Sequence, residues 1–240
     1  VVIRSGRSGP ALLPTLLVGG FGEHATSSSL RLSLAIAQNG SKEQHVKLAL
    51  SGILVPVSDI LRAALSRGDL YKFSAALALV RLCGPHVATG NGGGVQAIRD
   101  AIRVATNVLT LPVNIDADTN QMTTQEALKS ECICALESLS GNAALWSTIC
   151  SDALPAIVIY LRSCSEVGSM TQAVSATEMA ALRTVLEIVQ IPSHAAAAAE
   201  AGLSASLGKI IEKYTGSQSR REDATNLEIS LIALETLHAL

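Results

Sequence analysis

The sequence predicts an all-α fold assembled from one repeated helical unit. Hydrophobic residues make up 48% of the 240 residues, whereas aromatic residues make up only 2%. A core must therefore be filled mainly by Leu, Ala, Val and Ile, which suits closely packed helices better than a sheet rich in β-branched and aromatic side chains. In addition, segments with the apolar period of an amphipathic helix recur along the whole chain.

Long amphipathic segments form the first recurring motif. Each has small and apolar residues at i, i+3, i+4 and i+7, which predicts a helix with one buried face. The segments are LRLSLAIAQNG (30–40), FSAALALVRLCG (73–84), SECICALESLSG (130–141), EMAALRTVLEIV (178–189) and ISLIALETLHAL (229–240).

A turn residue followed by a second apolar helix precedes each of these segments. The second motif starts at Gly9, Gly52, Gly94, Asp152 and Gly202, so successive starts are 43, 42, 58 and 50 residues apart. The two longer intervals are explained by polar, turn-rich insertions at 112–124 and 164–175. We therefore expect a single domain over residues 1–240, with units of roughly 1–40, 41–84, 85–141, 142–190 and 191–240.

These units resemble armadillo repeats, with HEAT repeats as the near neighbour. DALPAIVIYL (152–161) and AALALVRL (75–82) are closest to the family's second and third helices, and the interval fits the family's period of roughly 40 to 47 residues. The resemblance implies a right-handed α-solenoid of about five three-helix repeats, whose neighbours bury each other's apolar faces. It also implies that the third helices line a concave groove for a partner peptide or helix.

The register of the third helices defines nine candidate groove residues. They are Arg31, Gln38, Ser74, Arg81, Glu131, Ser138, Thr177, Thr184 and Thr236. Nuclear-import adaptors of the family carry Asn and Trp ladders in this groove, and both ladders are absent here. The early units carry Arg and the later ones Glu, Ser and Thr, so we expect a partner with the complementary charge asymmetry.

The predicted function is a non-enzymatic protein–protein interaction scaffold. The alternative is a structural arm of a larger assembly, such as a vesicle coat, a tether or a chaperone adaptor, that contacts its partners through ends and edges. The terminal helix at 225–240 has no stop signal, which favours this alternative. Since the chain also starts at Val1, we expect a fragment whose partners include flanking domains of a longer protein.

The glycine-rich stretch ATGNGGGVQAIRD (88–100) invites comparison with a phosphate-binding loop. It lacks the G-K-[ST] of such a loop, and Val95 stands at the last Gly of the G-x-G-x-x-G pattern. Gly94 occupies the same repeat position as Gly52 and Gly202. We therefore predict a loop in place of the third unit's short first helix.

Motifs for metals and catalysis are incomplete. DADTNQMTTQEA (116–127) begins like a calcium loop, but Gln121 replaces its Gly and Ala127 replaces its bidentate Glu. The chain contains no H-E-x-x-H, C-x-x-C or G-x-S-x-G. We expect no catalytic residue, no cofactor and no metal.

Charge and hydropathy exclude two further classes of partner. The chain has 18 basic and 20 acidic residues and no run of Lys or Arg longer than two, so we expect no nucleic-acid binding. No stretch approaches the roughly 20 apolar residues that span a bilayer, so we expect no direct membrane insertion.

The odd count of five cysteines indicates reduced thiols and an intracellular, cytoplasmic or nuclear location. Tyr71, Phe73 and Trp146 are expected to pack between repeats, and any of them exposed on the groove becomes a binding anchor.

Overall fold

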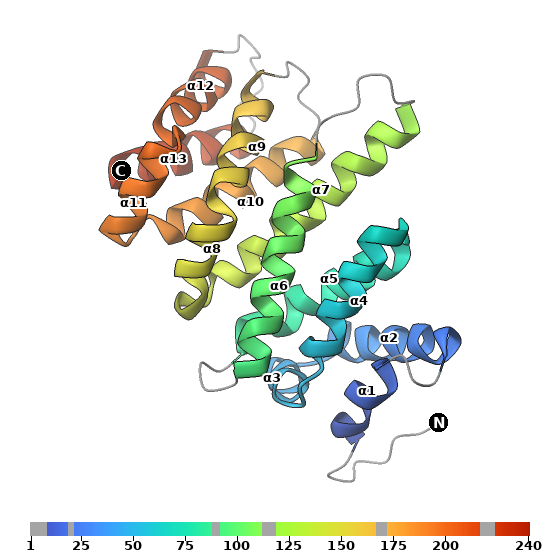
Figure 1. Ribbon diagram of the computed structural model, residues 1–240. Helices are drawn as coiled ribbons and strands as arrows, with labels where there is room; N and C mark the ends of the chain where they lie inside the picture. Colours follow the sequence, from blue (N-terminus) through green and yellow to red (C-terminus); the bar gives the residue numbers. More distant parts are fainter. Residues whose placement is uncertain (1–8, 19–21, 88–91, 112–118, 167–171, 217–223) are drawn as a thin grey trace. The chain divides into compact units, whose positions relative to one another are not determined.

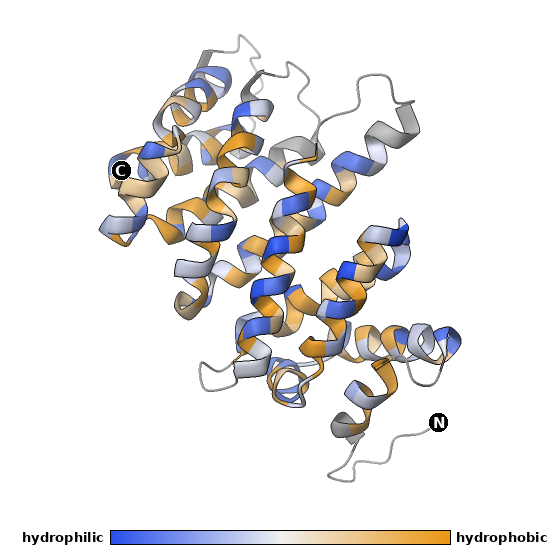
Figure 2. Cartoon of the chain, viewed as in Figure 1, coloured by the Kyte–Doolittle hydropathy of each residue, from blue (hydrophilic) through white to orange (hydrophobic). Residues whose placement is uncertain are grey.

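A computed structural model describes residues 9–18, 22–87, 92–111, 119–166, 172–216 and 224–240. Every regular element in these ranges is a helix, which confirms the all-α prediction (Figure 1). Most helices carry both hydrophobic and hydrophilic residues, as amphipathic helices do (Figure 2). The chain divides into two compact units, Val1–Val104 and Ala105–Leu240, with the boundary inside one helix. One continuous domain of five units stays a prediction.

Unit 1 is organised around its fifth helix. Its elements are α1 (Gly9–Leu17), α2 (Glu23–Gln38), α3 (Lys42–Leu50), α4 (Leu54–Arg67), α5 (Leu70–Cys83), the 3-10 helix η1 (Gly84–His86) and the first part of α6 (Gly92–Leu109). Helix α5 packs against α2, α3 and α4, and α1 packs against α2 and α4. Burial on several sides explains why Phe73, Ala76 and Leu79 of α5 are almost inaccessible to solvent.

Unit 2 is organised around its long tenth helix. After the end of α6 it contains α7 (Thr119–Ser140), η2 (Ala143–Leu145), α8 (Trp146–Asp152), α9 (Leu154–Glu166), α10 (Gln172–Ile188), α11 (Pro192–Glu200), α12 (Leu203–Gly216) and α13 (Ala224–Ala239). Helix α10 packs against α7 on one side and α13 on the other, and α12 packs against α9 and α13. Three segments predicted as third helices therefore lie side by side in chain order (Figure 1).

The predicted insertions are too long. Helix α9 continues to Glu166, α7 begins at Thr119 and α10 begins at Gln172, so each helix takes residues assigned to the insertions 112–124 and 164–175. Residues 112–118 and 167–171 lie outside the described residues. The predicted bounds are wrong because a polar, turn-rich stretch is not always a loop: the first and last turns of a helix tolerate polar side chains well.

Glycine geometry supports two of the three predicted repeat turns. Gly52 and Gly202 have φ of 82° and 86°, the left-handed region in which a Cβ is strained. Each follows a helix, α3 or α11, and precedes the next one. Gly94 differs, because α6 already begins at Gly92 and Gly94 lies in its first turn. The predicted loop is thus shorter than expected, and its residues 88–91 lie outside the described part.

Replacing Phe73 by Ala tests the central role of α5. Phe73 is 1% exposed, so its loss removes buried apolar area and leaves a cavity. We expect Phe73→Ala to lower the free energy of unfolding by about 3–5 kcal/mol in urea titrations. Leu70→Ala on the same helix is the control, because Leu70 is 44% exposed and should cost less than about 1 kcal/mol. If the two variants lowered the free energy of unfolding equally, α5 would not be the core of unit 1.

Candidate functional surfaces

An arginine on α10 joins the three third helices of unit 2. Arg183 Nη1 lies 3.6 Å from Glu137 Oε1 on α7, and its Nη2 donates to Glu228 Oε1 on α13. The side chain of Arg183 is 45% exposed, so each pair contributes at most about 1 kcal/mol. Their main consequence is positional, since they place Glu137, Arg183 and Glu228 on one solvent-facing surface. We call the outward sides of α7, α10 and α13 the third-helix face.

The third-helix face of unit 2 is acidic. Glu187 lies one turn beyond Arg183 on α10, and Glu235 lies two turns beyond Glu228 on α13; both are exposed. Together with Glu137 and Glu228 they give this face four carboxylates, of which Glu137 and Glu228 pair with the one guanidinium. Unbalanced carboxylates on a shared surface attract Lys and Arg side chains.

Six of the nine predicted groove residues have solvent access. Arg31, Gln38, Arg81 and Glu131 are exposed, and Ser74 and Ser138 are partly so. The other three, Thr177, Thr184 and Thr236, are buried, and this corrects the prediction that a partner contacts them.

Each buried threonine satisfies its hydroxyl inside the fold. Thr184 Oγ1 donates to the Ala180 carbonyl at 2.8 Å, and Thr236 Oγ1 donates to the Ile232 carbonyl at 2.7 Å. Thr177 shares a 2.7 Å hydrogen bond with Ser130 of α7. Such bonds allow a threonine to be buried without an unpaired polar group.

The register of the prediction was wrong by one position on α10. A single residue turns a helix by about 100°, which separates a buried site from an exposed one. Arg183 and Glu228 occupy the face that Thr184 and Thr236 were expected to occupy. The sequence itself indicates the exposed position on α10, because the charged residue Arg183 directly precedes Thr184.

Unit 1 carries an exposed aromatic on its own third helices. Tyr71 is 50% exposed, its hydroxyl accepts from Arg31 Nε at 3.0 Å, and the Arg31 guanidinium lies 5.0 Å from its ring centroid. This cation–π contact links α2 to α5 and leaves Tyr71 half exposed to solvent. Phe73 is buried, as predicted. Trp146 is half-buried, and its Nε1 donates to the Ser140 carbonyl.

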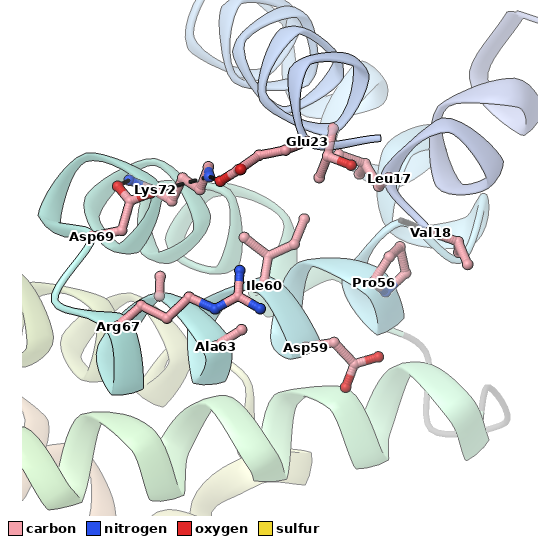
Figure 3. Close-up of a pocket in the computed structure, with 12 residues that line it drawn as sticks. Leu17, Val18, Glu23, Pro56, Asp59, Ile60, Ala63, Arg67, Asp69 and Lys72 are labelled. Atoms are coloured by element: carbon pink, nitrogen blue, oxygen red, sulfur yellow. Dashed lines mark hydrogen bonds and ion pairs between the residues drawn. The ribbon is translucent and has the colours of Figure 1, made fainter. Parts of the chain in front are cut away.

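A pocket of about 420 Å³ lies among α1, α2, α4 and α5 (Figure 3). Its apolar lining includes Leu17, Pro56 and Ile60, and its rim is charged. The sequence analysis missed this pocket, because its lining comes from four helices and from no single motif.

A lysine on the rim is held by two carboxylates. Lys72 Nζ lies 2.6 Å from Glu23 Oε1 and 3.1 Å from Asp69 Oδ2. A hydrogen bond from the Lys72 side chain lowers the pKa of Glu23, while the backbone N–H of Lys72 and then its side chain lower the pKa of Asp69. The two side-chain bonds raise the pKa of Lys72. Asp69 also accepts from the Lys72 backbone N–H at 3.1 Å, which caps α5. The rim lysine therefore anchors α2 to α5.

A second charged cluster is buried in unit 2. Glu178 is fully buried, and its Oε2 accepts from Tyr214 Oη at 2.6 Å and from Lys213 Nζ at 3.2 Å. Lys213 Nζ also donates to the Cys164 carbonyl at 2.9 Å, so the cluster ties together α9, α10 and α12. Because solvent does not reach Glu178, we read this cluster as structural.

Metal and thiol chemistry have little support in the described residues. No group of three or more His, Cys, Asp and Glu side chains there could hold a metal ion. Asp116 and Asp118 of the calcium-like motif lie outside the described part. Burial raises the pKa of Cys83 and of Cys164 to about 11 in each case, which leaves little thiolate at neutral pH.

Membrane spans are equally weakly indicated. In the described ranges no single helix is long and apolar enough to cross a membrane. Two pairs of helices, α3 with α4 and η2–α8 with α9, reach that length and composition only when taken together, and they are bent by 84° and 69°.

Comparisons with known proteins concern the fold. No family model matches the chain, and no curated protein matches its sequence. The chain is similar to a crystal structure of an engineered protein, with a TM-score of 0.52 and 16% identity over 95% of this chain and 96% of that one. A second crystal structure of an engineered protein has a TM-score of 0.48 and 16% identity over 95% and 98% of the two chains. The first of these likenesses shows a similar helical fold and nothing about function.

Stability of unit 1 should depend on pH through Lys72. The lowered carboxyl pKa values stabilise the fold above their ordinary values of 4.5 and 3.8, and this gain is lost as pH falls through the lowered values. The raised pKa of Lys72 stabilises below 10.5 and is lost at higher pH. We therefore expect the Tm of Lys72→Met to lie below that of wild type at pH 7 and to converge with it near pH 3. Lys42→Met, which removes an exposed lysine that forms no ion pair with a carboxylate of the described residues, should show no such convergence. A constant gap for Lys72→Met across this range would contradict the ion-pair account.

Proposed function

We propose that this chain is a non-enzymatic scaffold of armadillo type, with about five repeats, that binds a partner peptide along its third helices. The acidic third-helix face of unit 2 carries the proposal. Its side-by-side helices carry charged side chains on an exposed surface, which the docking of an extended peptide requires. The internal repeat in the sequence supports the armadillo assignment.

The charge of the face defines the partner segment. Four carboxylates and one arginine on this face favour a peptide with Lys or Arg at intervals, and rim charges act mainly on association rate and specificity. In unit 1, Arg31 stacked on the exposed Tyr71 offers an aromatic anchor on a more basic surface. We therefore expect the two units to prefer partner segments of different charge.

An array of 15-residue peptides, probed with the purified chain, tests this function. The bound peptides should be enriched in Lys and Arg, and their Kd should rise with salt. Glu187→Arg should weaken the best of them by about fivefold in fluorescence anisotropy, because it reverses an exposed charge on the face. Glu200→Arg, an exposed charge reversal on α11, is the matched control and should have no effect. Equal binding by both variants, or no enrichment of basic peptides, would refute the peptide-binding face.

A structural arm of a larger assembly is the second candidate. One observation favours it: α13 exposes several leucines, which is typical of an edge that contacts another helix. Such an arm would lie in the cytoplasm and use its ends and edges, so the peptide array would then yield no basic consensus.

A further inference from the structure

The pocket of unit 1 has an apolar side and a charged side. Leu17, Val18 and Pro56 lie on one side of it, and Ile60 lies between them and the other side (Figure 3). Charged side chains from α2, from the end of α4 and from the start of α5 form the second side; they are Glu23, Arg67, Asp69 and Lys72. A molecule that fills this pocket must therefore be apolar at one end and polar at the other.

The volume of the pocket suits a small molecule. It measures about 420 Å³, which lies within the range of about 300–1,000 Å³ that small-molecule sites occupy. If each non-hydrogen atom takes roughly the 30 Å³ of a water molecule in the liquid, the pocket holds about 14 of them. An unbranched chain of about eight to ten carbons with a small polar head fits this space.

The carboxylates that line the pocket already have cationic partners. Lys72 Nζ lies 2.6 Å from Glu23 Oε1 and 3.1 Å from Asp69 Oδ2. Asp59 Oδ1 lies 3.6 Å from Arg62 Nη1, and Arg62 does not line the pocket. Because these charges are balanced within the fold, they repel an incoming anion only weakly.

The guanidinium of Arg67 is the charge that stays available to a ligand. Arg67 is exposed and forms no ion pair with a carboxylate of the described residues. Its side chain extends from α4 toward Ile60, across the pocket (Figure 3). A guanidinium presents parallel N–H groups that match the two oxygens of a carboxylate, so Arg67 can bind such a head group with two hydrogen bonds.

Two helix N-termini lie at the charged side of the pocket. Glu23 is the first residue of α2, and Lys72 lies in the first turn of α5. Asp69 caps α5, whereas the N-cap residue of α2 is Gly22, which has no side chain to accept from the first N–H groups. Since the N-terminus of a helix carries a partial positive charge, an anion is favoured on this side of the pocket.

We propose that this pocket binds a small amphipathic carboxylate of the size of a medium-chain fatty acid. The carboxylate pairs with Arg67, and the hydrocarbon chain lies against Ile60, Pro56 and Val18. This site is independent of the peptide-binding face, because all its residues belong to unit 1.

Octanoate is the probe, and octylammonium, which has the same chain length and the opposite charge, is its comparison. Each is titrated to about 20 mM into the full chain labelled with ¹³C at the isoleucine methyl groups, so that the signal of Ile60 reports occupancy of the pocket itself. Octanoate should shift the Ile60 methyl signal in a saturable way with a Kd on the order of 1 mM. Octylammonium should bind at least about fivefold more weakly, because Arg67 repels it.

Three variants separate the contributions of charge and shape. Arg67→Met should weaken octanoate about fivefold and remove the preference for octanoate over octylammonium. Ala63→Leu should weaken both compounds, because Ala63 lines the pocket and the larger side chain fills part of it. Lys47→Met, which removes an exposed cation on α3 outside the lining, should change neither Kd. Circular dichroism melts of each variant verify that the fold is retained.

Three results would overturn the proposal. The first is an Ile60 methyl signal that does not respond to octanoate up to about 20 mM, where even a weak small ligand registers. The second is octylammonium binding as tightly as octanoate, which would show that the pocket selects no anion. The third is an octanoate Kd that stays the same in Arg67→Met or in Ala63→Leu, which would place the ligand elsewhere.

Discussion

No helix in this protein can bury its apolar side alone, and the structure depends on this constraint. A chain with so few aromatic residues has only small aliphatic side chains to exclude water, so helices must approach closely and pack on more than one side. Helix α10 illustrates the consequence, because α7, α13 and α9 contact it and most of the apolar residues described on it are buried. Thr184 enters this environment with its hydroxyl bonded to the Ala180 carbonyl, whereas Glu178 leaves its Oε1 without a hydrogen-bond partner among the described residues.

Ion pairs and hydrogen bonds then favour one register of each helix on the next, which apolar packing alone distinguishes only weakly. Ala, Leu and Val make many similar contacts, so several registers of one helix on the next have comparable energies. Arg183 with Glu137 and Glu228 on the surface, and Glu178 with Lys213 and Tyr214 inside, favour one register in unit 2. Lys72 with Glu23 and Asp69 does the same in unit 1. The buried carboxylate is costly to desolvate and is retained with two donors around it.

Function in such a fold is a property of surfaces. The third-helix face of unit 2 carries four carboxylates and one arginine, which pairs with two of them. The partner proposed for this face is a basic extended segment. The pocket among α1, α2, α4 and α5 has an apolar wall, but its rim lysine is already neutralised by two carboxylates.

The sequence by itself determined the helical class, the positions of the ten main helical segments and the left-handed turns at Gly52 and Gly202. These depend on local periodicity and on the conformational freedom of glycine, which a single segment carries within itself. Tertiary structure decided which residues face solvent. Thr184 and Arg183 are neighbours in one helix, and the packing of other helices around α10 makes the first inaccessible and leaves the second exposed, because one residue turns the helix by about 100°.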